Sequence, residues 1–176
     1  QNLPQPVKLF YFTQIFRHER PQAGRFRQHW QFGFESMGSS DPVLDAEVIE
    51  MACALYKGIG LRDLVLKLNS IGCKQCRPDY ISKLKNYYLD KVERLCPDCR
   101  HRIESNTLRL LDCKRQSCLL LTDQAPKSID HLCDECQGHF ASLTEYLGIV
   151  GLDYHLEHRL VRGLDYYTKT VFEIQP

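Results

Sequence analysis

The sequence predicts an α+β fold, in which part of an antiparallel β-sheet core with a flanking helix is interrupted by a mostly helical inserted subdomain. Residues 28–37 alternate apolar and polar side chains as a strand does, and residues 42–58 carry apolar side chains at helical spacing. Residues 73–158 are richer in cysteine, lysine and helix-forming stretches, and a strand-like run returns over residues 160–174. The insert is therefore expected to leave and re-enter one sheet.

The first two strands are expected to form a long hairpin. Residues 7–17 are rich in β-branched and aromatic side chains and contain no glycine or proline. Along residues 28–37, Trp30, Phe32 and Phe34 share one face, which we expect to point towards a core. The opposite face carries His29, Gln31, Gly33 and Glu35.

That polar face has the shape of a floor for a small ligand. Gln31 and Glu35 stand about 13 Å apart at about 3.3 Å per residue. Gly33, between them, has no side chain, so a ligand could lie on the backbone. An amide and a carboxylate accept hydrogen bonds from an ammonium or imidazole group. The alternative is an ordinary solvated face of an antiparallel sheet.

The loop between the two strands concentrates positive charge around Pro21 and Gly24. Its cations are Arg17, His18, Arg20, Arg25 and Arg27. Guanidinium groups suit phosphate oxygens, and they can stabilise charge that develops on phosphorus during a displacement. A polyphosphate would therefore satisfy the loop, and the alternative is a basic solvent loop with Glu19 and Glu35 as surface partners.

The remaining elements follow in order. Asp41 before Pro42 is typical of a capped helix, here expected to end near Gly58. Residues 62–69 alternate as a further strand, and residues 81–94 and 131–147 are expected helices of the insert. The predicted division is a catalytic core part over 1–70, an inserted subdomain over 71–158 and a return to the core over 159–176.

Composition limits the class of protein. With 43% apolar and 26% charged residues, the chain resembles a soluble globular protein. A net charge of +1 gives no global field for nucleic acid, so any RNA contact must be local. No apolar stretch approaches the roughly 20 residues of a membrane span, so a cytoplasmic location is the default expectation. The start at Gln1 is expected to mark an excerpt of a longer protein.

Residues 160–168 form a second polar constellation in an apolar region. Arg162 is costly there unless it is paired. Asp165 could be its partner. Alternatively, Arg162 reaches the pocket of the loop arginines, and a tyrosine hydroxyl, of Tyr166 or Tyr167, orients a polar substrate.

Eight of the nine cysteines fall into close pairs, which in a chain without a secretory signal favour metal or reduced thiols over disulfides. Spacing predicts one zinc site from the first two pairs and one from the last two. The first set is Cys73, Cys76, Cys96 and Cys99, and the second is Cys113, Cys118, Cys133 and Cys136. Buried reduced thiols are the alternative.

Several of these segments resemble signatures of one family. Residues 16–28 followed by 31–35 resemble motif 2 of histidyl-tRNA synthetases, and residues 160–168 resemble their histidine-specific motif. Residues 68–72 and 108–112 resemble further signatures, so the similarity extends over essentially the whole chain. The resemblance implies part of a class II synthetase core that activates L-histidine with ATP and transfers it to tRNA(His).

The resemblance assigns ATP contacts and catalytic cations to particular positions. Arg17 matches the arginine that holds the α-phosphate and the substrate carboxylate, and Arg162 supports the same phosphate from the opposite side. Glu19 matches a residue near adenine, and Arg25 one that meets the distal phosphates. His29 would stack on adenine, although the family usually places an aromatic residue before histidine at this position, not after it.

The histidine contacts come from the hairpin and from the second motif. Gln31 matches the contact to the α-amino group, and Glu35 with Tyr167 matches the pair that hydrogen-bonds both imidazole nitrogens. The complete expected set is Arg17, Gln31, Glu35, Arg162, Tyr166 and Tyr167. Activation would depend on positioning and cationic stabilisation, with Mg²⁺ on the outer phosphates.

Two parts of the family pattern are missing from these residues, namely motif 1 and motif 3 with the anticodon-binding domain. The excerpt alone is expected to be inactive, and a homodimer is implied by analogy. Two rivals are a synthetase-like regulatory paralogue in histidine biosynthesis and a zinc-stabilised nucleic-acid-binding module. Lys83, Lys85 and Lys91 could touch the tRNA acceptor arm or form a solvated helix face.

Overall fold

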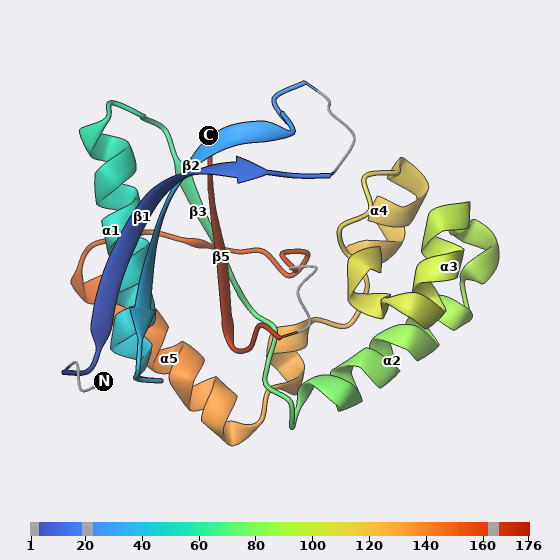
Figure 1. Cartoon of the computed structure of the whole chain (residues 1–176). Coiled ribbons are helices and arrows are strands. Elements are labelled where there is room, and N and C mark those ends of the chain that lie inside the picture. The colour runs from blue at the N-terminus through green and yellow to red at the C-terminus, as the bar shows by residue number, and fades with distance from the viewer. Residues whose placement is uncertain (1–3, 19–22, 162–165) are drawn as a thin grey trace.

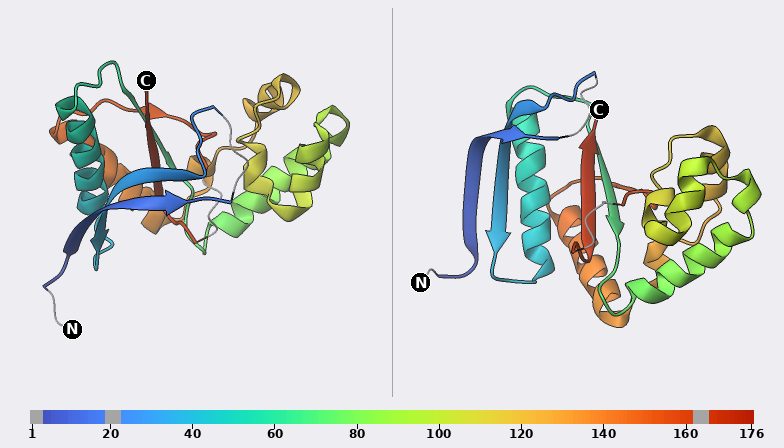
Figure 2. Two further views of the ribbon diagram at one scale, coloured as in Figure 1. Left: turned by 45° about the horizontal axis from the view of Figure 1, so that its top comes forward. Right: turned by 45° about the vertical axis from the view of Figure 1, so that its right-hand side comes forward.

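A computed structural model describes residues 4–18, 23–161 and 166–176. A β-hairpin stands on one side of helix α1 (Pro42–Gly58), and a three-stranded sheet with helix α5 (Asp134–Ile149) lies on the other side (Figures 1 and 2). Helices α2 (Arg77–Leu89), α3 (Pro97–Ser105) and α4 (Gln116–Thr122) extend beyond that sheet. The α+β class predicted from the sequence is confirmed.

The predicted hairpin is present. Strands β1 (Val7–Phe16) and β2 (Gln28–Met37) pair antiparallel from Val7↔Met37 to Phe16↔Gln28. The backbone N–H of Arg17 donates to the carbonyl of Arg27 over 2.7 Å, which continues the pairing into the loop.

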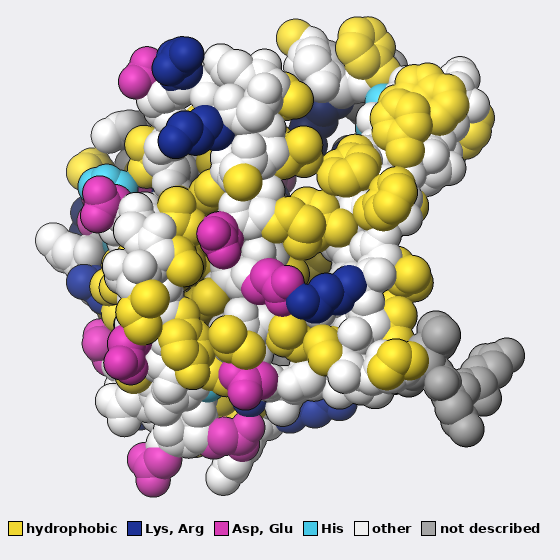
Figure 3. Space-filling model, turned by 90° about the vertical axis from the view of Figure 1, so that its left-hand side faces the viewer, with side chains coloured by type: hydrophobic (Ala, Val, Ile, Leu, Met, Phe, Trp, Pro, Cys, Tyr) yellow, Lys and Arg dark blue, Asp and Glu magenta, His cyan; other side chains and the backbone are white. Residues whose placement is uncertain are grey.

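The prediction that the aromatic face of β2 points into a core is wrong for the described chain. Trp30 is 62% exposed and Phe32 46% exposed, and Phe12 of β1 stacks on Trp30 at a centroid distance of 4.9 Å. Hydrophobic side chains gather in a band on this side of the molecule (Figure 3). The reason is that no described element packs over the outer part of this face, so the rings cover only one another.

Helix α1 (Pro42–Gly58) begins where the sequence predicts. The Asp41 carboxylate accepts a hydrogen bond from the N–H of Val43 over 2.9 Å, which satisfies one unpaired donor of the first turn. Its apolar face, with Ala46 and Ile49 buried, packs against helix α5 and the central sheet.

The central sheet has the order β4-β3-β5. Strand β3 (Val65–Ser70) pairs antiparallel with β5 (Thr170–Gln175), and the short β4 (His155–Leu156) pairs parallel with β3. The chain therefore returns beside the strand it left, as expected. The strand predicted over 160–174 begins only at Thr170, because Lys169 adopts the left-handed backbone conformation (φ 59°) immediately before it.

The insert is helical, but its helices are shifted from the predicted ranges. Its elements are α2 (Arg77–Leu89), η1 (Val92–Arg94), α3 (Pro97–Ser105), η2 (Thr107–Leu110), α4 (Gln116–Thr122), η3 (Ser128–His131) and α5 (Asp134–Ile149). The helix predicted over 81–94 starts early because Pro78 suits a first turn, and it ends at Leu89 because Lys91 leaves helical geometry. The helix predicted from His131 starts at Asp134, after extended backbone at Leu132 and Cys133.

The insert has its own hydrophobic core, and side-chain hydrogen bonds connect it to the central sheet. Leu84 and Tyr88 of α2 and Leu121 of α4 are fully or almost fully buried. The buried side chain of Asn69 in β3 donates to the carbonyl of Leu160 over 3.0 Å and accepts from Ser128 Oγ over 3.3 Å. Among the described residues, no helix is long and apolar enough to cross a membrane.

Candidate functional site

The polar face of the hairpin is already partly filled by a residue of β1. Tyr11 lies opposite Gly33, and a Cβ on Gly33 would come within 2.3 Å of Tyr11 Cζ. The Tyr11 hydroxyl accepts a hydrogen bond from Gln31 Nε2 over 2.7 Å. The expectation of open backbone at Gly33 is therefore wrong, because an aromatic ring uses the missing side chain. The sequence signal for Tyr11 is an aromatic residue opposite a glycine, which becomes visible only when the two strands are aligned with each other.

Glu35 lies at the other end of the same face, opposite Leu9, and its side chain is exposed. A hollow of about 200 Å³ beside it is lined by the hairpin and α1. There the Lys8 ammonium pairs with the Glu47 carboxylate over 2.5 Å. This exposed contact joins the hairpin to α1 near the Met37 end.

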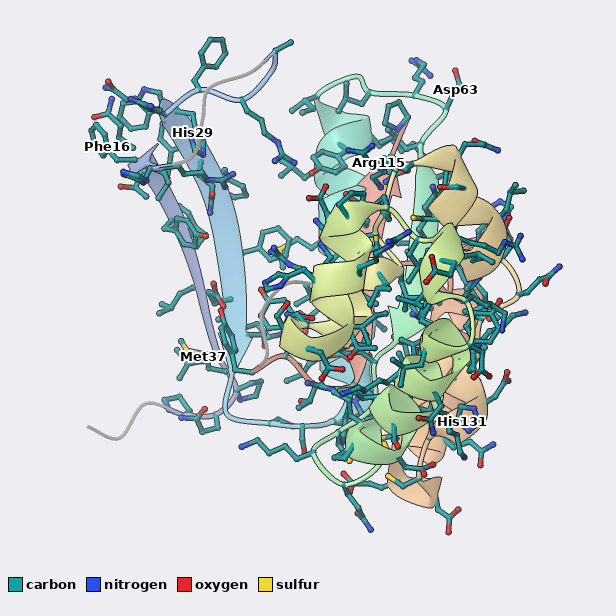
Figure 4. The ribbon with its side chains drawn as sticks, turned by 90° about the vertical axis from the view of Figure 1, so that its right-hand side faces the viewer. Phe16, His29, Met37, Asp63, Arg115 and His131 are labelled. Carbon is teal, nitrogen blue, oxygen red and sulfur yellow. The ribbon has the colours of Figure 1, made fainter. Side chains whose placement is uncertain are left out.

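The cationic loop lies at the far end of the hairpin from Met37, where Figure 4 places Phe16 and His29. Arg17 and His18 are exposed, and His29 is half-buried. Arg17 has no side-chain hydrogen bond or ion pair with any residue in the described ranges, so its guanidinium is available to an anion there. Glu19 and Arg20 lie outside the described residues.

Arg25 of this loop borders a cavity of about 440 Å³. The central sheet contributes Lys67 and Glu173 to its lining, and the insert contributes Asp112 and Lys114. The cavity thus joins three parts of the chain that are distant in sequence. Its mixed charge suits a polar ligand rather than an apolar one.

An ion pair orders one wall of this cavity. Arg159 contacts the Glu157 carboxylate at 3.1 Å. Burial alone would raise the pKa of Glu157, but hydrogen bonds from the Arg159 side chain and backbone hold that pKa below its usual value. Glu157 is therefore ionised at neutral pH and neutralises Arg159 as a potential anion contact.

Residues 160–168, which resemble the histidine-specific motif, are only partly described, since Arg162 and Asp165 lie outside the described residues. Tyr166 is 72% exposed, and its ring meets that of Tyr167 edge to face at 5.0 Å. The carbonyl of Tyr167 accepts a hydrogen bond from the Arg77 guanidinium. In the described ranges, no recorded contact joins Tyr167 to Gln31 or Glu35. The expected pairing of Glu35 with Tyr167 around one imidazole stays a prediction.

The cysteines form two groups of four, but not the groups that spacing predicts. We call Cys73, Cys76, Cys133 and Cys136 tetrad A, and Cys96, Cys99, Cys113 and Cys118 tetrad B. Within each tetrad all four sulfur atoms lie within 4.8 Å of one another. The predicted grouping of the first two pairs is wrong because α2, at 13 residues and about 20 Å, carries Cys96 away from Cys76.

Neighbouring hydrogen bonds already favour the thiolate at one cysteine of each tetrad. Backbone N–H groups of Cys76 and Gln75 lower the pKa of Cys73 to about 6. Burial opposes ionisation of Cys96, but hydrogen bonds from the Cys99 backbone and from neighbouring thiols lower its pKa to about 7. Burial and the adjacent sulfurs raise the pKa of Cys99 well above its usual value. Four thiolates in one tetrad therefore need a cation.

Sequence comparison identifies the family. A family profile described as histidyl-tRNA synthetase matches residues 1–75. A histidine–tRNA ligase of Dehalococcoides mccartyi is 58% identical over all 176 residues. The chain belongs to the histidyl-tRNA synthetase family. It spans 42% of the length of that curated relative, so it corresponds to less than half of a complete synthetase.

Solved structures agree with this family. The apo histidyl-tRNA synthetase of S. aureus is 34% identical, with a TM-score of 0.73, over 98% of this chain and 40% of that one. A Bacillus halodurans protein titled as an ATP phosphoribosyltransferase regulatory subunit/histidyl-tRNA synthetase is 22% identical, with a TM-score of 0.59 over 98% of this chain and 48% of that one. At that identity, the second likeness concerns the fold alone.

Proposed function

We propose that the whole protein activates L-histidine with ATP and transfers the histidyl group to tRNA(His). A histidine carboxylate oxygen attacks the α-phosphorus of ATP and pyrophosphate leaves, which gives histidyl-adenylate. A hydroxyl of the terminal ribose of the tRNA then attacks the histidyl carbonyl carbon, and AMP leaves. The observation that carries the proposal is 58% identity to a histidine–tRNA ligase across both motif-bearing ends of the chain.

The phosphate half of the proposed site lies at the loop end of the hairpin. Arg17 would hold the α-phosphate and the substrate carboxylate, with Arg162 opposite it. Glu19 and His29 would contact adenine, and Arg25 would meet the distal phosphates. The exposed guanidinium of Arg17 and the position of Arg25 beside the 440 Å³ cavity support this assignment.

The histidine half uses the polar face of β2 and the second motif. Gln31 would contact the α-amino group, while Glu35 and Tyr167 would contact the imidazole nitrogens and Tyr166 would lie beside them. The hydrogen bond from Gln31 to Tyr11 supports a role in orientation, because it holds the amide on the face that carries Glu35. Tyr11 therefore joins the proposed site as the residue that positions Gln31.

By analogy with the family, we propose Mg²⁺ with ATP, tRNA(His) as the acceptor and a homodimer as the assembly. Structural Zn²⁺ in the insert is proposed from its cysteines alone. We also propose a cytoplasmic location. We further propose that residues 1–70 and 159–176 belong to the catalytic core and residues 71–158 to an inserted subdomain, since β3 and β5 pair across that insert.

Histidine-dependent exchange of pyrophosphate into ATP by the full-length protein tests the proposal. Exchange should require histidine, and the Arg162→Ala variant should lose it by about 10²- to 10³-fold, as expected for a cation that stabilises transition-state charge. Exchange that ignores histidine, or that survives the substitution undiminished, would overturn the assignment. A full-length protein that folds and binds histidine without any exchange would instead favour the regulatory paralogue.

A further inference from the structure

We propose that tetrad A and tetrad B each bind one zinc ion, and that the ion in tetrad A positions the backbone segment that carries Tyr167. The second part rests on the proposed function, because it concerns histidine binding. The first part depends on the sulfur geometry alone.

The sulfur separations fit a single tetrahedral ion. Zinc–thiolate bonds of about 2.3 Å in tetrahedral geometry place the sulfurs about 3.8 Å apart. In tetrad A, Cys73 Sγ lies 3.7 Å from Cys76 Sγ and 3.8 Å from Cys133 Sγ, and Cys76 Sγ lies 3.9 Å from Cys136 Sγ. These distances are far too long for disulfides, which need about 2.05 Å, and all nine cysteines are free.

Tetrad B repeats this arrangement inside the core of the insert. Cys96 Sγ lies 3.9 Å from Cys113 Sγ, and all four cysteines of the tetrad are buried. Both donor sets consist only of thiols, which select zinc or iron over Mg²⁺ or Ca²⁺. An iron–sulfur cluster would need room between the cysteines for several iron and sulfide atoms, and sulfurs this close leave room for one ion.

Tetrad A lies at the junction between the insert and the central sheet, directly after the end of β3 at Ser70. Gly72 precedes Cys73 and adopts a left-handed conformation (φ 67°), and a Cβ on it would lie 2.7 Å from Cys76 Sγ. The carbonyl of Gly72 accepts a hydrogen bond from the N–H of Lys169 over 2.8 Å. The loop that supplies two thiols of tetrad A is therefore bonded directly to the segment between Tyr167 and β5.

Two side chains adjacent to the tetrad A cysteines strengthen this link. Arg77, next to Cys76, donates to the carbonyls of Ile71 and Gly72 over 3.1 Å each, and also to the carbonyl of Tyr167. Glu135, between Cys133 and Cys136, pairs with the Lys169 ammonium over 2.8 Å. An ion that fixes the four sulfurs thus fixes both groups that hold residues 167–169. Tetrad B has no recorded contact of this kind with the described part of that segment.

Metal analysis of the full-length protein, purified without added zinc, tests the first part. We expect two zinc ions per chain in the wild type, and one in each of Cys73→Ser/Cys133→Ser and Cys99→Ser/Cys113→Ser. Cys53→Ser is the matched control, because Cys53 belongs to neither tetrad, and it should retain two. A folded protein without metal, or with iron in place of zinc, would overturn the zinc assignment.

Cobalt provides a second readout if the serine variants fail to fold. Protein produced with Co²⁺ in place of zinc should show the visible absorption of tetrahedral cobalt thiolate, with two ions per chain. Absence of that absorption from folded, cobalt-grown wild-type protein would overturn the tetrahedral sites.

The positioning part is tested by the KM for histidine in pyrophosphate exchange. Loss of tetrad A should raise this KM about tenfold, the scale of an outer-shell defect, with the KM for ATP unchanged. Loss of tetrad B should leave the KM for histidine unchanged. Arg77→Lys retains all thiols and should keep two zinc ions while raising the same KM, because lysine cannot reach three carbonyls at once.

An equal effect of both tetrads on the KM for histidine would overturn the positioning role and leave the zinc sites standing. A wild type with two zinc ions but no histidine-dependent exchange would refute the proposed function without touching the metal assignment. The two failures are therefore distinguishable.

Discussion

The hairpin and the cysteine-rich insert bury their apolar side chains to very different extents. In the hairpin, Phe10 is 75% exposed and Phe16 71% exposed, although they belong to a row of aromatic residues. In the insert, Leu84 and Tyr88 are completely buried in a core made almost entirely of insert residues. The hairpin touches the rest of the described chain chiefly through α1, whereas residues 80–125 of the insert pack on one another and α5 packs on α1.

This difference indicates that the insert contributes mainly to stability and the hairpin mainly to binding. The insert has what an independent folding unit needs, namely a core and two groups of convergent thiols. The hairpin has exposed polar and cationic groups in an ordered register, which is what a binding surface needs. Stability should therefore respond to changes in the insert, and catalysis to changes in the hairpin.

The largest loss of stability is expected from Leu84→Ala. Removing a fully buried leucine from the insert core should cost about 2–5 kcal/mol, because it leaves a cavity. Leu89→Ala, on the same helix at a 45% exposed position, is the matched control and should cost far less. Denaturant unfolding of the full-length protein measures both. Equal losses would mean that the insert does not have a packed core.

Arg17→Ala should have the largest effect on catalysis. Histidine-dependent exchange should fall by about 10²- to 10³-fold, because a cation at the α-phosphate is lost, while the thermal midpoint changes little. Lys8→Ala removes another hairpin cation that pairs with Glu47, and it should leave exchange near the wild-type rate. If both variants lose activity equally, the hairpin acts through its general charge and not through Arg17.

Asp41→Ala probes the helix that connects the two regions. Loss of the cap on α1 should cost about 1 kcal/mol, and Asp41→Asn should retain most of it, because asparagine caps equally well. Chemical denaturation followed by circular dichroism is the measurement. A destabilised Asn variant would show that charge, and not the hydrogen bond, is what matters at this position.

The smallest expected effect concerns pH at the junction of α1 and α5. Burial lowers the pKa of His139 below 6.5, although Asp45, Asp41 and Glu135 oppose this shift and Lys169 adds to it. The unfolded chain therefore takes up the proton first, and stability should fall as pH drops below about 6.5 until the folded-state pKa is passed. His139→Gln should reduce this loss between pH 7.5 and 5.5. The exposed His155, changed to Gln, should not.

The local sequence pattern predicted the helices and strands better than it predicted which of them pack against one another. The two strands of the hairpin and the start of α1 follow from period-two alternation and from Asp41, both of which are properties of neighbouring residues. The exposure of Trp30 could not be predicted, because burial of this face depends on a covering element that the alternation does not specify. Tyr11 was missed for a different reason, since its role depends on the cross-strand register that places it opposite Gly33.

The cysteine tetrads show this limit most clearly. Spacing correctly singled out eight thiols in close pairs, because the short gap within each pair, two residues in three of them and four in Cys113/Cys118, is a local property. Which pairs meet depends on how α2, α3 and α4 return along one another. The packing of these helices brings Cys73 and Cys133 together, although 60 residues separate them in the sequence.

The pairing of β3 with β5 sets an order of events during synthesis. A ribosome that adds about 5–20 residues per second completes β5 roughly 5–20 seconds after β3, because about a hundred residues separate the two strands. Throughout that interval β3 has an unpaired edge, while the insert, which is synthesised between them, can already form its own core. The core of the insert can thus form before β5 is synthesised, and its folding brings β5 next to the free edge of β3.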